Sequence, residues 1–545
     1  MKNHIIYKNG RIYTLDSKER VLEAMEIKDG RIINIGSNIE FFHKNSDAEI
    51  IDLDGAVVLP GICDCHVHPV IFGSTSLGID AYDKTKEAIL EEVSEMAKTL
   101  PESKWIVGMG WNQDYWTDSS FPTKEELDAV APNHAVKLTR YCGHASWCNS
   151  KALKLAGLDG IFDPSVKDEG ILLDATGHLA GTIYRNHCKM VDDAKTTYDE
   201  EDHKLMLKAT QKEFLKNGIT SAIDKGAGAE APLSTDCGRK AISALKSLYE
   251  SGEMKCRFYE EVVVSDEFLE DCYSNGPEIS LYDDKFTLRG IKLWADGAMG
   301  ARSAWLSEDY KDRKGFRGNP QYSDEELIKI FKDADKHGYQ VSIHAIGDAT
   351  SKQVIDCYEK AFVGDLYKDR RFMIEHFHIP TNEDVARLLK YNIILSTQFI
   401  QFSSDMKALS NILPDHMLQR IYPWREVLDG GGVLCSGSDV PIDAPLPFPA
   451  LYSAVTRKSV EGVNCLETPP YKSLTRLEAI RAFTTAAAYT MFKEDVLGSL
   501  EKGKHADFIV IDKDYFQCAE EEIKDIQVLK TVIAGEEVYN KTSTN

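Results

Sequence analysis

The fold is decided by residues 57–68, Val-Val-Leu-Pro-Gly-Ile-Cys-Asp-Cys-His-Val-His. This short apolar run is typical of a buried strand, and we expect a strand over residues 57–63. Because side chains two positions apart on an extended chain point to the same side, the imidazoles of His66 and His68 converge just beyond the strand. An HxH pair alone is frequent by chance, so it indicates a metal site only together with ligands from other strands.

Apolar, β-rich segments alternate with helical patterns from residue 58 to residue 495, which is typical of βα units and a parallel sheet. We expect barrel strands at residues 57–63, 219–223, 258–264, 290–294, 341–344, 372–374, 393–396 and 433–435. This number of strands predicts an α/β chain folded as a distorted TIM (β/α)8 barrel. The gap between the first two strands is too long for one crossover helix, so we expect an insertion subdomain after strand 1, over about residues 75–200.

Both ends of the chain carry short strand-and-turn patterns outside the barrel. Asn9-Gly10 and Asp29-Gly30 separate short apolar runs near the N-terminus, and such dipeptides are hairpin signals. Neither end can bury a core by itself, so we expect residues 1–57 and 496–545 to form one small composite β-sandwich domain. The barrel of residues 58–495 then lies between them in the sequence.

Charge and composition exclude several classes of protein. The chain has 87 acidic and 64 basic residues, and its net charge of -23 would repel nucleic acid and anionic lipid surfaces. No apolar run approaches the roughly 20 residues that span a bilayer, and the 12 cysteines form no CxxC pair or regular framework. We therefore expect a soluble, cytoplasmic protein whose partner is a small-molecule substrate, with no nucleic acid and no membrane; assembly as a homodimer stays open.

Lys292 lies in residues 291–294, Ile-Lys-Leu-Trp, where alternation places it opposite its two aliphatic neighbours. A lysine facing the helix layer would be an unpaired buried charge, so we expect Lys292 to point into the barrel. Desolvation and nearby cations lower the pKa of a lysine, and its neutral amine can take up carbon dioxide to become a metal-bridging carbamate. The alternative is a structural ion pair with Asp296 or Glu260.

Further candidate ligands stand where later predicted strands end. His344 ends one of these strands, and His376 ends the next, although His378 has the same parity and could replace it. Asp439 follows the strand at residues 433–435, where a carboxylate can bind a metal and take a proton from water. The structural alternative for Asp439 is an Asx turn that opens the loop.

The carboxyl ends of barrel strands are where active sites lie, so these side chains should meet. Together they supply the three or more nitrogen and oxygen ligands that a catalytic metal requires. We expect divalent metal ions, with zinc, manganese or iron suited to these donors. The candidate metal ligands are His66, His68, Lys292, His344, His376 and Asp439, and Asp439 is also the candidate catalytic residue.

The sequence resembles the amidohydrolase superfamily, in its amidohydrolase 3 branch, which includes the YtcJ-like proteins and N-substituted formamide deformylase. The matching stretches occur in the family's order and span nearly the whole chain. They are residues 59–69, 143–153, 291–302, 344–348, 374–376, 437–439 and 497–507. The resemblance implies a distorted barrel with a β-sandwich from both termini and a hydrolytic metal centre that is usually binuclear.

The resemblance also implies a role for each candidate ligand. One metal would be held by His66, His68 and Asp439, the other by His344 and His376, and carboxylated Lys292 would bridge the two metals.

Candidates for binding the substrate come from the insertion and from the loops after strands. They are His144, Trp111, Trp294 and Arg302. Aromatic walls with a few polar groups are typical of a small-molecule pocket. For Trp111 a place in a hydrophobic core is the structural alternative.

The leading hypothesis is a metal-dependent amidohydrolase acting on a C–N bond, other than a peptide bond, of a small molecule. In it a metal-activated hydroxide attacks an amide-type carbonyl, and Asp439 passes the proton to the leaving amine. One alternative is a mononuclear metal-dependent deaminase, in which Lys292 stays unmodified. The other is a non-catalytic scaffold on the same fold, against which the complete set of ligands argues.

Overall fold

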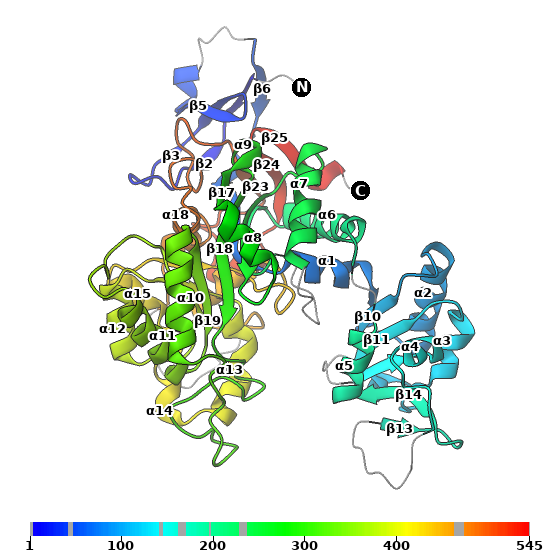
Figure 1. The fold of residues 1–545 in the computed structure, drawn as a ribbon. Coiled ribbons are helices and arrows are strands. Elements are labelled where there is room, and N and C mark those ends of the chain that lie inside the picture. Colours follow the sequence, from blue (N-terminus) through cyan, green and yellow to red (C-terminus); the bar gives the residue numbers. More distant parts are fainter. Residues whose placement is uncertain are drawn as a thin grey trace. The chain divides into compact units, whose positions relative to one another are not determined.

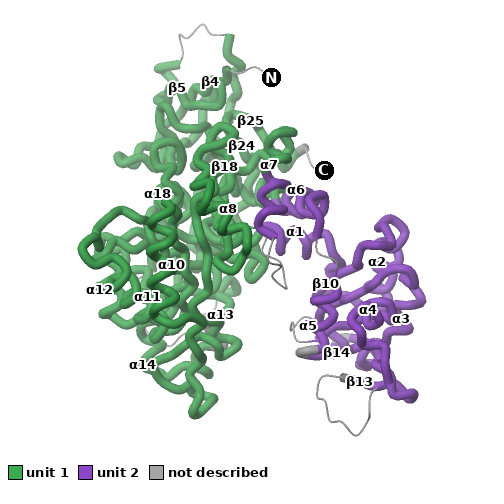
Figure 2. Tube along the Cα trace, viewed as in Figure 1, with its two compact units in different colours: residues 1–68, 211–227, 246–545 green, residues 69–210, 228–245 purple. Residues whose placement is uncertain are grey.

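The computed structural model describes residues 4–41, 47–140, 145–161, 171–195, 198–227, 237–462 and 473–543. The chain forms two compact units, shown in Figure 2. Unit 1 comprises Met1–His68, Gln211–Ala227 and Lys246–Asn545, and unit 2 comprises Pro69–Thr210 and Gly228–Leu245. None of the helices in the described residues combines the length and the apolar character that a membrane-spanning helix needs.

Unit 1 contains the predicted parallel barrel, with strands in the order β22-β21-β20-β19-β18-β16-β15-β8. The strands are β8 (Ile62–Val67), β15 (Ile219–Asp224), β16 (Arg257–Val263), β18 (Phe286–Trp294), β19 (Gln340–Ala345), β20 (Met373–His376), β21 (Ile394–Thr397) and β22 (Leu434–Ser436). A short strand, β17 (Glu278–Ser280), pairs antiparallel with β18 outside this order. A parallel bridge between Val67 and Val440 nearly closes the ring between the first and last strands. The predicted distorted TIM barrel is confirmed.

Helices accompany the barrel strands, as Figure 1 shows for α10 and α11 beside β19. In unit 1 they are α8 (Phe268–Asn275), α9 (Leu281–Asp284), α10 (Asp324–His337), α11 (Asp348–Ala361), α12 (Asn382–Lys390), α13 (Gln401–Ile412), α14 (Asp415–Leu418), α15 (Trp424–Asp429), α16 (Pro447–Thr456), α17 (Arg476–Ala482) and α18 (Thr485–Thr490). Two more helices, α6 (Glu200–Lys216) and α7 (Cys237–Glu250), begin in residues assigned to unit 2 and end in residues assigned to unit 1.

Helix α10 illustrates how local sequence sets these boundaries. It begins with a capping box, in which the Ser323 hydroxyl accepts the Glu326 N–H and the Glu326 carboxylate accepts the Ser323 N–H. Leu327, Phe331 and Ala334 recur on one face and are buried. The helix ends at His337 and is followed by Gly338, whose φ of 80° is left-handed and is tolerated best by glycine.

The strand predicted over residues 57–63 is divided between two sheets, so that prediction was wrong in part. Val57–Pro60 forms β7, which pairs with β23 (Phe508–Ile511) and β2 (Arg11–Tyr13), and only β8 belongs to the barrel. The break falls at Gly61, where an added Cβ would lie 2.3 Å from the Thr220 hydroxyl oxygen. Glycine thus permits the close approach at which the chain passes from one sheet to the other.

Both ends of the chain contribute to two further sheets in unit 1, a four-stranded one ordered β5-β4-β1-β6 and a six-stranded one ordered β25-β24-β23-β7-β2-β3. Their remaining strands are β1 (His4–Lys8), β3 (Val21–Leu22), β4 (Ala24–Lys28), β5 (Arg31–Gly36), β6 (Glu49–Asp52), β24 (Val528–Ile533) and β25 (Glu536–Asn540). One buried cluster contains Ile27, Val58 and Phe508, so it draws on both sheets and both termini. The domain boundaries at residues 57 and 496 stay predictions.

Unit 2 contains a six-stranded sheet in the order β13-β14-β12-β11-β10-β9. Its elements are α1 (Pro69–Leu77), β9 (Ile79–Asp80), α2 (Lys86–Thr99), β10 (Ile106–Trp111), α3 (Lys124–Val130), β11 (Val136–Arg140), β12 (Ala145–Cys148), α4 (Ser150–Leu155), β13 (Ile171–Leu173), β14 (Leu179–Tyr184) and α5 (Arg185–Asp193). Trp111 lies in the core of this unit, stacked on Trp116, and its indole N–H donates to the Leu138 carbonyl at 2.7 Å. The structure therefore gives Trp111 the core position named as its alternative.

A buried ion pair links the barrel to the sheet of the termini. At the start of β16, Arg257 donates to both carboxylate oxygens of Asp507, at 2.6 and 3.0 Å. Burial alone would raise the pKa of Asp507, but Arg257 holds it below its usual value. Asp507 also accepts the Ala534 N–H at 2.8 Å, so its charge is well satisfied.

Arg257→Met should leave the Asp507 carboxylate buried without its cation. We expect the free energy of unfolding to fall by about 3–5 kcal/mol. The pair stabilises the fold above the aspartate's ordinary pKa, and this contribution disappears as the pH falls through the lower pKa of the folded state. Urea unfolding should show that the wild-type chain is more stable than the variant at neutral pH. The difference between their free energies of unfolding should shrink in acid. Equal stability at neutral pH would contradict this role for the pair.

Candidate metal centre

The histidines of the HxH motif meet Asp439 at the seam between the first and last barrel strands. His66 lies in β8 and His68 just beyond it, and the Nε2 atoms of both are 3.3 Å from Asp439 Oδ1. The three residues offer ligand atoms that all lie within 4.8 Å of one another. A backbone hydrogen bond also joins these two segments, because the Asp439 N–H donates to the His66 carbonyl at 2.7 Å.

Asp439 is held in an unusual conformation, with a φ of 62°. Aspartate is one of the few residues other than glycine that adopts this left-handed region readily. Its Oδ2 accepts the Gln401 side-chain N–H at 3.0 Å, which leaves Oδ1 toward the histidines. Burial would raise the pKa of Asp439, but the neighbouring His66 keeps it well below its usual range. The carboxylate is therefore ionised, as a metal ligand must be.

His66 is orientated by a carboxylate on the side away from Asp439. Its Nδ1–H donates to Glu375 Oε2 at 2.7 Å, so Nε2 carries the lone pair. Burial, together with nearby Lys292, lowers the pKa of His66 to about 4. A neutral imidazole with one nitrogen bonded to a carboxylate is the usual form of a metal-ligating histidine.

His344 and His376 lie beside this group, with ring centroids 4.5 Å apart, and the His376 ring is 5.0 Å from that of His66. His344 Nε2–H donates to the Gly297 carbonyl at 3.2 Å, which directs Nδ1 to a ligand role. His376 Nδ1–H donates to Gln398 Oε1 at 2.6 Å, which leaves Nε2 for that role. Burial lowers the pKa of both, that of His344 to about 3, so both imidazoles are neutral.

His378, the alternative to His376, has different surroundings. Its Nε2 lies 3.2 Å from Gln401 Oε1, and its ring packs 4.6 Å from that of Tyr422. The structure therefore brings His376, rather than His378, against His66 and His344. A left-handed φ of 70° at His376 makes this arrangement possible at the end of β20.

Lys292 is fully buried, and its Nζ lies 3.5 Å from His66 Nε2. Among the described residues, it forms no ion pair with Asp296 or Glu260, the structural alternative considered for it. Asp296 instead accepts the N–H groups of Ile346 and Gly347 at 3.1 and 2.9 Å. Burial lowers the pKa of Lys292. Its amine thus points at the candidate centre, as the strand alternation predicts.

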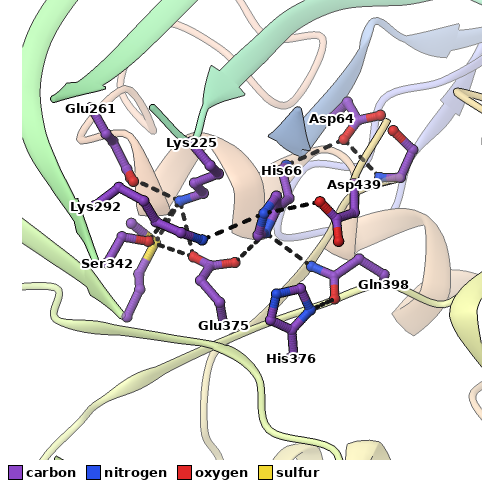
Figure 3. A network of polar contacts seen from close by, with 12 residues as sticks. Asp64, His66, Lys225, Glu261, Lys292, Ser342, Glu375, His376, Gln398 and Asp439 are labelled. Atoms are coloured by element: carbon purple, nitrogen blue, oxygen red, sulfur yellow. Dashed lines mark hydrogen bonds and ion pairs between the residues drawn. The ribbon is translucent and has the colours of Figure 1, made fainter. Parts of the chain in front are cut away.

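A second buried lysine, Lys225, which was not among the residues predicted from the sequence, lies in the same network (Figure 3). Lys225 Nζ is 2.8 Å from Glu261 Oε1, 3.0 Å from Glu375 Oε1 and 3.0 Å from Ser342 Oγ. Burial would lower the pKa of Lys225, but the two glutamates raise it above its usual value. The amine of Lys225 is therefore fully engaged, whereas that of Lys292 is not.

The remaining candidates for substrate binding are less tightly grouped. Trp294 is half-buried, with its ring 5.6 Å from Lys292 Nζ. Arg302 lies in the loop after β18 and donates to Asp312 at 2.6 and 3.1 Å. His144 lies outside the described residues. Of the described candidates, the structure places only Trp294 against a candidate metal ligand.

The donors fit a divalent cation. His66, His68 and Asp439 converge two imidazole nitrogens and an ionised carboxylate on one point, and further neutral imidazoles adjoin them. Nitrogen and oxygen donors of this kind suit zinc and similar first-row ions. Their position at the carboxyl ends of barrel strands is where this fold carries its active sites. Fold and site together are typical of metal-dependent hydrolases.

A model of the Amidohydrolase family matches residues 49–539, and the chain belongs to this family. It is 29% identical to YtcJ of Bacillus subtilis (strain 168), over 98% of this chain and 99% of that protein. It is 26% identical to N-substituted formamide deformylase of Arthrobacter pascens, over 98% of each. The predicted amidohydrolase 3 branch is confirmed.

The solved structures agree with this assignment. The chain is similar to an uncharacterized metal-dependent hydrolase from Pyrococcus horikoshii OT3, with a TM-score of 0.79 and 26% identity over 95% of this chain and 99% of that one. A second such hydrolase, from Pyrococcus furiosus, gives a TM-score of 0.78 and 25% identity. Family and fold support the assignment of the protein as a metal-dependent hydrolase.

Proposed function

We propose that the protein is an amidohydrolase that uses divalent metal ions to hydrolyse an amide-type C–N bond, other than a peptide bond, in a small molecule. The observation that carries this proposal is the convergence of His66 Nε2 and His68 Nε2 on Asp439 Oδ1, each at 3.3 Å. The relative named N-substituted formamide deformylase supports an amide-type substrate. A cation bound at these ligands would lower the pKa of water and polarise a carbonyl.

The protein's own residues would then orient the substrate and move a proton. Asp439 is ionised and buried, and Gln401 holds one of its oxygens at 3.0 Å. We assign to Asp439 the role of accepting a proton from the attacking water and passing it to the nitrogen of the leaving amine. The low-dielectric surroundings strengthen each of these electrostatic contacts.

We further propose a binuclear centre, most simply of zinc, in which carboxylated Lys292 is the bridge. Two observations support this. The Lys225 amine forms ion pairs with Glu261 and Glu375, while the Lys292 amine faces His66. The neutral imidazoles of His344 and His376 lie beside the first three ligands and would hold the second ion. We propose that the protein acts in the cytoplasm on a small-molecule substrate.

The test is a panel of N-formyl, N-acyl and cyclic amide compounds, together with aminated ring compounds, offered to the protein loaded with zinc, manganese or iron. We expect hydrolysis of at least one of the amides, with amine and acid groups formed in equal amounts. Ammonia released from aminated rings, with one metal per chain and no carbamate, would instead favour the mononuclear deaminase. No turnover of any compound by metal-loaded protein would overturn the proposal.

A further inference from the structure

Behind the candidate ligands lies a buried group of charged and polar side chains from four parts of the barrel. Lys225 follows β15, Glu261 lies in β16, Ser342 in β19 and Glu375 in β20, and all four are buried. Figure 3 shows the contacts that connect them to His66. The proposed proton transfer at Asp439 uses none of these residues, so their presence in the barrel interior needs another explanation.

Glu375 is the member of this group that contacts a candidate ligand. Its Oε2 accepts the Nδ1–H of His66 at 2.7 Å. Its Oε1 accepts the Ser342 hydroxyl at 2.6 Å and lies 3.0 Å from Lys225 Nζ. Donors on three different segments therefore fix both oxygens of one carboxylate, which can rotate only by breaking several buried contacts.

We propose that Glu375 and Lys225 are positioning residues for the metal that His66 would bind. Glu375 fixes His66 as the tautomer with a proton on Nδ1, so that Nε2 faces Asp439. Lys225 acts through Glu375, because its amine holds the glutamate and not the histidine. This inference rests on the proposed metal centre, whose function depends on the direction in which the His66 ring points.

Groups that form a hydrogen bond with a metal-ligating histidine have an effect of known size on metal affinity. Removing a hydrogen-bond partner behind a metal-ligating histidine typically weakens metal binding about 10–100-fold. A lysine that only neutralised two buried glutamates would behave differently, since its loss would lower stability and leave metal affinity unchanged. Metal affinity therefore separates a positioning role from a purely structural one.

The experiment compares Glu375→Gln and Lys225→Met with the wild-type chain. Lys137→Met is the matched control, because Lys137 is also a buried lysine paired with a carboxylate, that of Asp192 at 2.5 Å, and among the described residues neither belongs to a group that could hold a metal. Zinc dissociation constants of the metal-free proteins are measured by competition with a chromophoric chelator. The visible spectrum of each cobalt-loaded protein reports the geometry of the ligands independently of affinity.

We expect both site variants to bind zinc about 10–100-fold more weakly and to change the cobalt spectrum. The double variant should be little worse than Glu375→Gln alone, because both changes act through one carboxylate. Lys137→Met should keep the wild-type affinity and spectrum. If Lys225→Met does not fold, Glu375→Gln and Ser342→Ala carry the test, with a smaller loss of affinity expected for the serine variant.

Wild-type zinc affinity and an unchanged cobalt spectrum in folded Glu375→Gln would overturn the proposal. The same result in folded Lys225→Met would overturn the part that concerns the lysine. If the wild-type chain binds no zinc or cobalt, the proposed metal centre itself fails and this inference fails with it. The two failures are therefore distinguishable.

Discussion

Asp439→Asn is expected to reduce turnover of an amide substrate by roughly two to four orders of magnitude, the loss typical of a positioned proton-transfer group. Asparagine keeps the size of the side chain and its contact with Gln401, which now lies at 3.0 Å. It removes the negative charge that faces His66 and His68, and it cannot take up a proton near neutral pH. Steady-state kinetics with metal-loaded protein measures the loss.

The matched control for this variant is Asp384→Asn. Asp384 is also a buried aspartate, but it caps helix α12 through Thr381 and contacts no candidate ligand. This variant should lose about 1 kcal/mol of stability and keep its turnover. Wild-type turnover in Asp439→Asn, with the metal content unchanged, would contradict the role assigned to Asp439.

Lys292→Met is expected to reduce the metal content from two ions per chain to one. Methionine fills much of the volume of the buried lysine but cannot carry a carbamate. Turnover should fall about 100–1000-fold, the usual cost of losing one preorganised electrostatic contact at a reacting centre. Elemental analysis gives the metal content, and isotopically labelled bicarbonate should give a carbamate signal in the wild-type chain but not in Lys292→Met.

Lys137→Met serves again as the control for replacing a buried lysine, and it should retain both metals and the carbamate signal. A Lys292→Met chain that still holds two metals would rule out the bridge. A wild-type chain that shows two metals and no carbamate would require a different bridging group between them.

The barrel could be predicted from the sequence because its strands are short, largely apolar segments that alternate with helical patterns. What the sequence could not fix was the partner of each strand. Residues 57–60 and 62–67 have the same local character, yet the first group pairs with β23 and the second with β15. Pairing between segments so distant in sequence depends on the assembled fold and not on local propensity.

The candidate ligands could be predicted because each stands where a strand ends, and such ends share one rim of the barrel. Glu375 was missed although it lies beside His376. On a regular strand the side chains of Glu375 and His376 would point to opposite sides. The left-handed φ of 70° at His376 lets both side chains face the site. A signal was available, since a glutamate inside an apolar strand needs a buried partner, as does Lys225 directly after β15.

The most direct test of the central claim is the activity of the protein on its amide substrate before chelation, after chelation and after one metal is restored at a time. The metal centre formed by His66, His68 and Asp439 predicts that activity falls to background when the metal is removed and returns with a divalent cation. Unchanged activity in protein shown to contain no metal would contradict it.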